Sequence, residues 1–151
     1  MCLRNATNGI DWASQFEGQK YITCYKVLEV DKNRKNKIRL FSPYQGTIYY
    51  PGVIVSSRKF DNSFYKLGEC CGDILENDSD FWSIKRGIHV LTTIEEATGY
   101  MYEGKEVILS VRCKVEDLIG YNKDLERAVF NKVYVEQRSY DRALKRAAKV
   151  F

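Results

Sequence analysis

The chain has 151 residues, and its 24 Lys or Arg against 20 Asp or Glu give a formal net charge of +4. This length suits one domain, and 44% hydrophobic residues with only two prolines exclude a collagen-like, low-complexity or intrinsically disordered chain. No apolar run could span a membrane, and the first residues lack the apolar centre of a signal peptide. We therefore expect one domain over residues 1–151 that works in the cytoplasm.

The first half of the chain predicts an arm followed by strands. Residues 1–19 show no clean period and are expected to form an N-terminal arm before a sheet-rich core at 20–136. Strand patterns follow at 21–30, 38–44 and 47–57. The polar loop "DKNRKNK" between the first two patterns is typical of a hairpin tip, and the Pro-Gly pair in the third indicates a turn or bulge. Residues 58–80 are irregular.

A capped helix is predicted in the second half. "WSIKRGIHVLT" (82–92) reads as a strand, and Thr93-x-x-Glu96 is a capping box that begins a helix at 93–102. The apolar positions of this helix form a stripe of Ile94, Ala97 and Met101.

Two more strand patterns follow that helix. "EVILSVRCKV" (106–115) alternates clearly, with Val107, Leu109, Val111, Cys113 and Val115 on one face. "EDLIG" suggests a single helical turn, and "RAVFNKVYVE" (127–136) is expected to be the last strand.

The C-terminal segment 138–151 predicts a basic amphipathic helix at 139–150. Tyr140, Leu144, Ala147 and Phe151 share one face at helical spacing. The segment carries one acid, Asp141, and five cations, so its net charge of +4 equals that of the whole chain. We predict that these cations form a binding surface for phosphates or an acidic partner: Arg138, Arg142, Lys145, Arg146 and Lys149. A solvated face of a docked helix and a membrane-surface contact are the alternatives.

His89 is the only histidine and the one candidate catalytic residue. If Ile88 and Val90 point into the core, His89 points outward, and an unperturbed imidazole would suit acid–base chemistry. No catalytic motif surrounds it, although Cys70 or Cys71 could form a thiol–imidazole pair if the fold brings them together. We expect a structural histidine.

The cysteines predict neither a disulfide framework nor a metal site. Their number, five, is odd, no C-x-x-C occurs, and Cys70 and Cys71 are adjacent. The acids of "GDILENDSD" lack the pattern of a calcium-binding loop. We expect reduced thiols, no metal and no cofactor.

Four short motifs lie within residues 60–136: "YKLGE", "GIHVLTTIEEATGY", "VILSVRCKVEDLIG" and "RAVFNKVYV". These motifs resemble an uncharacterised domain family of phages and bacteria, some of whose members lie beside pentapeptide repeats. Where the relatives often have Lys-Cys-Arg, this chain has Leu125-Glu126-Arg127. The resemblance implies a phage or prophage context without a defined activity.

The "GIHV" strand and the helix after it also resemble ADP-ribosyltransferase-like folds. This second resemblance implies a nucleotide pocket at His89.

Together these patterns predict an α+β fold, with a curved antiparallel or mixed sheet of about six strands and helices at 93–102 and 139–150. The predicted function is that of a non-catalytic binding protein, encoded by a phage and active in the host cytosol. It would engage a host factor or an anionic ligand, a nucleotide or nucleic acid. An ADP-ribosyltransferase-like NAD-binding enzyme and a module that self-assembles through the C-terminal helix are the alternatives.

Overall fold

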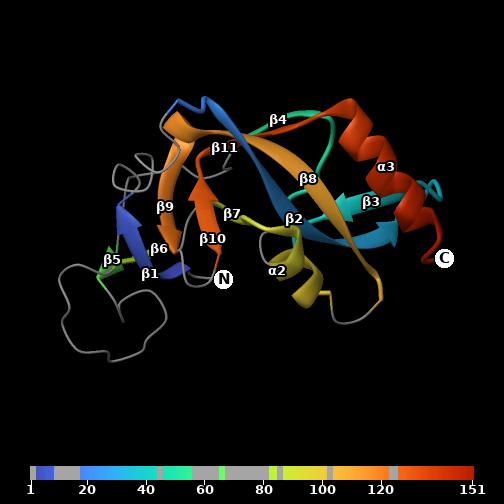
Figure 1. The fold of residues 1–151 in the computed structure, drawn as a ribbon. Helices are drawn as coiled ribbons and strands as arrows, with labels where there is room; N and C mark the ends of the chain where they lie inside the picture. The colour runs from blue at the N-terminus through green and yellow to red at the C-terminus, as the bar shows by residue number, and fades with distance from the viewer. Residues whose placement is uncertain are drawn as a thin grey trace.

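The computed structural model describes residues 3–8, 18–43, 46–55, 65–66, 82–84, 87–101, 104–122 and 126–151 (Figure 1). In this part of the chain an antiparallel sheet is combined with helices, which confirms the predicted α+β class.

The sheet is open, because the strand order β4-β11-β8-β2-β7-β10-β9-β1-β6-β5 does not return to its start. Strand β3 pairs with β2 beside this path. The described residues form eleven strands, several of them only two to four residues long. Their bounds are β1 Leu3–Asn8, β2 Tyr21–Lys32, β3 Ile38–Phe41, β4 Gly52–Val55, β5 Tyr65–Lys66, β6 Trp82–Ile84, β7 Ile88–Leu91, β8 Glu106–Lys114, β9 Leu118–Asn122, β10 Arg127–Phe130 and β11 Lys132–Val135.

The long strand β2 is the centre of the sheet. Its residues 21–29 pair with β8 along one edge. Its other edge pairs with β7 at Tyr25 and with β3 at residues 29–32, so the sheet divides on that side. The observed strand begins where the sequence predicted and continues two residues further, to Lys32.

Two predicted strands are each divided in the structure. Residues 82–92 form β6 and β7, and Gly87 between them has φ +111°, a conformation that favours glycine. A Cβ at Gly87 would lie 2.5 Å from Cγ1 of Val129, so the site also requires a residue without a side chain. Residues 127–136 form β10 and β11, which pair with different strands on either side of Asn131.

The N-terminal arm contains a strand that the sequence pattern did not reveal. β1 pairs with β9 and with β6, both antiparallel. These pairings are what stabilise a strand without a clear period of its own. Similarly, the predicted turn at "EDLIG" is a 3₁₀ turn, η2 (Val115–Asp117), and the rest of that stretch belongs to β9.

Helix α2 (Ile94–Gly99) is shorter than the predicted 93–102 but has the predicted N-cap. The Thr93 hydroxyl accepts a hydrogen bond from the Glu96 amide (3.3 Å) and donates one to the Glu126 carboxylate (2.8 Å). The expected apolar stripe is only partly correct. Ala97 is fully buried, whereas Ile94 and Met101 are 41% and 38% exposed.

The core lies on the face of the sheet formed by the alternate residues of β2 and β8. The prediction for β8 is correct at Val107, Leu109, Val111 and Cys113, which are all buried. Helix α3 (Gln137–Ala148) packs against β8 and β3 on one side of the molecule (Figure 1). It begins and ends two residues earlier than the predicted 139–150.

Candidate functional site

The outward face of α3 carries all five predicted cations. Arg138, Arg142, Lys145, Arg146 and Lys149 are exposed. At 100° per residue they fall within an arc of about 100°, opposite the buried side of the helix. In the described part of the chain none of the five forms an ion pair. Arg146 alone has a specific contact, a 2.7 Å hydrogen bond from its guanidinium to the carbonyl oxygen of Ile108.

Small residues fix α3 on the sheet and thereby set the direction of its cationic face. Ala143 and Ala147 are fully buried, and Tyr140 and Leu144 are partly buried against the same core. Phe151 does not share this face as predicted, because the helix ends at Ala148. Its ring is 56% exposed, and the Lys32 ammonium lies 4.7 Å from the ring centroid.

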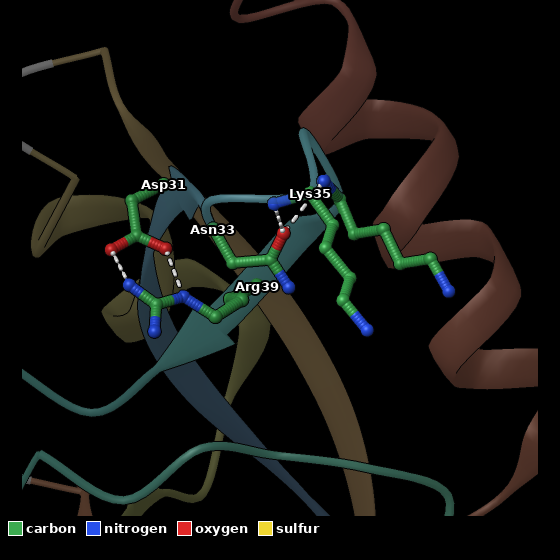
Figure 2. A network of polar contacts seen from close by, with 5 residues as sticks. Asp31, Asn33, Lys35 and Arg39 are labelled. Carbon is green, nitrogen blue, oxygen red and sulfur yellow. Dashed lines mark hydrogen bonds and ion pairs between the residues drawn. The ribbon is translucent and has the colours of Figure 1, made fainter.

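The tip of the β2–β3 hairpin is a second, ordered group of cations. Figure 2 shows the Asn33 side chain turned into the loop, where its Oδ1 accepts hydrogen bonds from the backbone amides of Lys35 (2.9 Å) and Lys37 (3.0 Å). The Asn36 amide donates to the Asn33 carbonyl (2.9 Å), and Asn36 has φ +62°. This is a turn closed by a left-handed residue, a common way to end a hairpin. The side chains of Arg34, Lys35 and Lys37 are left exposed around it.

An ion pair braces the base of this hairpin. Arg39 donates to Asp31 from Nε (2.8 Å) and from Nη2 (2.6 Å), the two-bond geometry that makes Arg–carboxylate pairs strong (Figure 2). Asp31 is the only acid among residues 31–39, and Arg39 neutralises it. The cations at the tip therefore have no acidic neighbour within their own loop.

His89 lies in β7 as predicted and is half-buried. Its Nδ1 is 3.2 Å from the carbonyl oxygen of Gly87, and its residue pairs with Val129 of β10. Its own carbonyl oxygen accepts a hydrogen bond from the Lys26 ammonium (2.7 Å). These contacts are consistent with the expected structural role of His89 in the sheet. Cys70 and Cys71 lie outside the described residues.

Lys26 is a buried cation that the predicted site residues did not include. It occupies the core face of β2, in the alternation of Cys24, Lys26, Leu28 and Val30. Burial lowers the pKa of Lys26 from 10.5 to about 8. The signal was readable in "YITCYKVLEV", because the strict alternation that buries Cys24 and Leu28 also buries Lys26.

The described thiols are buried and reduced. Cys24 and Cys113 lie on the core faces of the neighbouring strands β2 and β8, both as free cysteines. A hydrogen bond with Cys24, and then burial, raise the pKa of the Cys113 thiol. Because the thiolate is the reactive form of cysteine, the raised pKa makes the Cys113 thiol unreactive.

A third group of cations surrounds Tyr21 on the opposite face of the sheet. The Tyr21 ring has Arg112 at 4.9 Å, Lys20 at 5.6 Å and Lys114 at 5.9 Å from its centroid. Arg112 is also paired with Glu136 (3.2 Å) and Lys114 with Glu116 (3.9 Å). Since these cations already have partners within the protein, they are weaker candidates for a ligand than those of α3.

The described residues contain no group of three His, Cys, Asp or Glu side chains that could hold a metal ion. Among the same residues, no helix combines the length and the apolar character needed to cross a membrane. Comparison of the chain with protein-family models, curated proteins and solved structures gave no match. The assignment of the candidate site is therefore based on its geometry and charge alone.

Proposed function

We propose that this chain is a non-catalytic binding protein whose α3 cations engage an anionic partner. One observation carries the proposal: the outward face of α3 presents five exposed cations, and in the described chain none of them is neutralised by an ion pair. Grouped charge of one sign raises the local concentration of an oppositely charged partner and the rate of encounter. The resemblance of residues 60–136 to a phage and bacterial family makes a host factor or a nucleic acid in the host cytosol the expected partner.

The proposal favours binding over catalysis because the cations lie on a convex helix surface. Catalysis requires a group that is placed next to a reacting atom, with water excluded or controlled. Binding of an extended polyanion requires only accessible cations on a rigid support. The buried contacts of Ala143 and Ala147 provide that support.

The first prediction concerns the charge of α3. Replacing Arg138, Arg142, Lys145 and Lys149 with Gln removes four cations and leaves the Arg146 bond to Ile108 intact. At about 0.5–1 kcal/mol for each exposed charge contact, the affinity for labelled heparin, used as a general polyanion, should fall roughly thirtyfold or more. Fluorescence anisotropy measures the affinity, and circular dichroism with a thermal melt checks that the fold is retained.

A charge-matched pair of variants tests whether position or only net charge is important. Arg138→Gln with Arg142→Gln removes two cations from α3 and should lower the affinity for heparin roughly fivefold or more. Lys20→Gln with Lys132→Gln changes two cations away from α3 and should leave the affinity for heparin within about twofold. Unchanged heparin affinity in the folded α3 variant would contradict the proposal. NAD is added in a parallel titration, because tight NAD binding that His89→Ala abolishes would favour the enzyme alternative instead.

A further inference from the structure

We infer that the β2–β3 hairpin tip and the outward face of α3 form one binding surface, and that its ligand is the phosphate backbone of double-stranded DNA. This inference rests on the proposed function and assigns its ligand class and its second contact element. We call the residues Lys32, Arg34, Lys35 and Lys37 the hairpin cations, and Arg138, Arg142, Lys145, Arg146 and Lys149 the helix cations.

The two elements lie side by side although about one hundred residues separate them in the sequence. Lys32, at the end of β2, lies 4.7 Å from the ring centroid of Phe151, which follows α3. Helix α3 packs against β3, the second strand of the hairpin. Figure 1 shows the β2–β3 hairpin next to the C-terminal half of α3, and Figure 2 shows a helix beside the hairpin tip. The hairpin cations therefore extend the surface of the helix cations at its C-terminal end.

The hairpin tip is ordered without using the side chains that would contact a ligand. Asn33 and the backbone close the turn, and Asp31 with Arg39 braces its base. A loop that is already in its binding conformation loses less conformational entropy when a ligand binds. The backbone that carries the hairpin cations is thus preorganised for binding, as is the backbone of a helix.

The charge of the molecule is strongly divided between this surface and the rest. Residues 31–39 and 138–151 contain ten of the 24 cationic residues and two of the 20 acidic ones, so they carry a net +8. The whole chain is +4, which leaves −4 for all other residues. Both acids are engaged, Asp31 by Arg39 and Asp141 by the side-chain amide of Gln137 (2.9 Å). A polyanion would be attracted to this surface more strongly than to the rest of the molecule taken together.

The number of helix cations matches the number of phosphates that one DNA strand carries over the same length. From Arg138 to Lys149 the helix rises roughly 17 Å, at 1.5 Å per residue. Over that length each strand of a DNA duplex carries about five phosphates, one per 3.4 Å, and the helix presents five cations. Four arginines, at 34, 138, 142 and 146, add planar donors that suit phosphate oxygens.

A single strand fits this surface less well. Proteins that bind single strands stack successive bases on exposed aromatic rings. Here Tyr140 is partly buried against the core, and the Phe151 ring already has Lys32 beside it. Residues 31–39 and 138–151 contain ten cations and only these two aromatic rings, which favours contact with a backbone over contact with bases.

The test compares two variants that lose the same charge. Arg34→Gln with Lys35→Gln removes two hairpin cations, and Lys20→Gln with Lys132→Gln removes two cations away from the surface. Binding of the full chain to a labelled 20-base-pair DNA is measured by fluorescence anisotropy over a series of salt concentrations. The slope of log affinity against log salt should become shallower by about 1.8 in the hairpin variant, at 0.9 per phosphate contact, and stay unchanged in the control. A duplex of scrambled sequence should bind equally well.

The outcomes separate this inference from the proposed function. If the α3 variant loses DNA binding and the hairpin variant behaves like the control, the hairpin is not part of the site and the inference is overturned while the proposed function stands. If poly-glutamate binds and the DNA duplex does not, the ligand class is wrong but an anionic partner remains. If heparin, poly-glutamate and DNA all fail to bind the folded protein, both proposals are wrong.

Discussion

Lys26 shows how one residue can work against the stability of this fold. Its ammonium group lies among apolar side chains on the core face of β2, with the carbonyl oxygen of His89 as its hydrogen-bond partner. Desolvation disfavours the charged form, and the pKa falls from 10.5 to about 8. At pH 7 the amine is still protonated in both states, so the folded protein bears the full cost of the buried charge. That cost is about 3 kcal/mol for a shift of this size.

Lys26→Met should therefore stabilise the protein at pH 7. We expect a gain of about 1–3 kcal/mol, the lower figure allowing for the lost hydrogen bond to His89. Between pH 8 and 10.5 the unfolded state binds more protons at Lys26 than the folded state, so this residue makes wild-type stability rise with pH. Urea unfolding at pH 7, 8 and 9 should show the stability difference between the variant and the wild type shrinking as pH rises.

The difference between the two proteins isolates Lys26 from other titrating groups. Burial raises the pKa of the Tyr49 hydroxyl, and the raised pKa of the Cys113 thiol acts in the same sense, so both lower stability at high pH. They do so equally in the variant and the wild type. A variant that is less stable than the wild type at pH 7 would show that the Lys26 hydrogen bond outweighs its desolvation.

At the scale of the element, α3 depends on small residues where it meets the sheet. Ala143 and Ala147 have no exposed surface, so the helix backbone lies close to β8. Ala147→Leu would force extra atoms into this contact and should destabilise the protein by about 1–3 kcal/mol. Ala148→Leu, one position further on an exposed part of the helix, is the matched control and should have almost no effect.

Urea unfolding midpoints of the two Leu variants check this prediction. Equal midpoints would mean that α3 is not packed as described. The same pair also tests function, since a displaced helix would carry its cations out of line with the hairpin. DNA affinity should fall in the Ala147 variant and remain in the control.

Elements with a strict period were predictable, and those defined by their partners were not. β2 and β8 alternate over nine or more residues, so the sequence located both strands and, for β8, also the buried face. By contrast, nothing local marks the change of partner at Asn131, which divides one predicted strand into β10 and β11. β1 likewise exists through its pairing with β6 and β9.

The candidate site was predictable to the same partial degree. The helical spacing of 138–151 located the helix cations and their common face, because that information is local. The approach of Lys32 to Phe151 depends on the packing of α3 against β3, which no pattern in either segment encodes. The sequence therefore located the helix cations and a polar hairpin loop, but it did not show that the two adjoin.

At the scale of the whole molecule, α3 is a layer of the fold as well as a candidate binding element. It covers part of the core that β2 and β8 share. Deleting residues 138–151 should therefore abolish cooperative thermal unfolding and expose apolar surface to the dye ANS. A chain lacking only Phe151, whose ring is mostly exposed, should unfold like the wild type.

This prediction also bears on self-assembly through the C-terminal helix. Self-assembly through this helix would use its apolar residues Leu144 and Phe151, but Leu144 packs against the core of its own chain. Aggregation of the shortened chain would thus report exposed core rather than a lost interface. A shortened chain that kept its cooperative transition at the wild-type temperature would show that α3 is dispensable for folding.

In the turn of the β2–β3 hairpin, the atoms that fix the shape of the loop differ from the atoms that would contact a ligand. The Asn33 side chain and the main chain give the loop its shape, whereas within the described chain the side chains of Arg34, Lys35 and Lys37 hold nothing in place. We therefore expect that exchanging those three residues for other polar residues leaves the folding free energy nearly unchanged. Natural variation would then alter the charge of this corner of the protein, one substitution at a time, without loss of the fold.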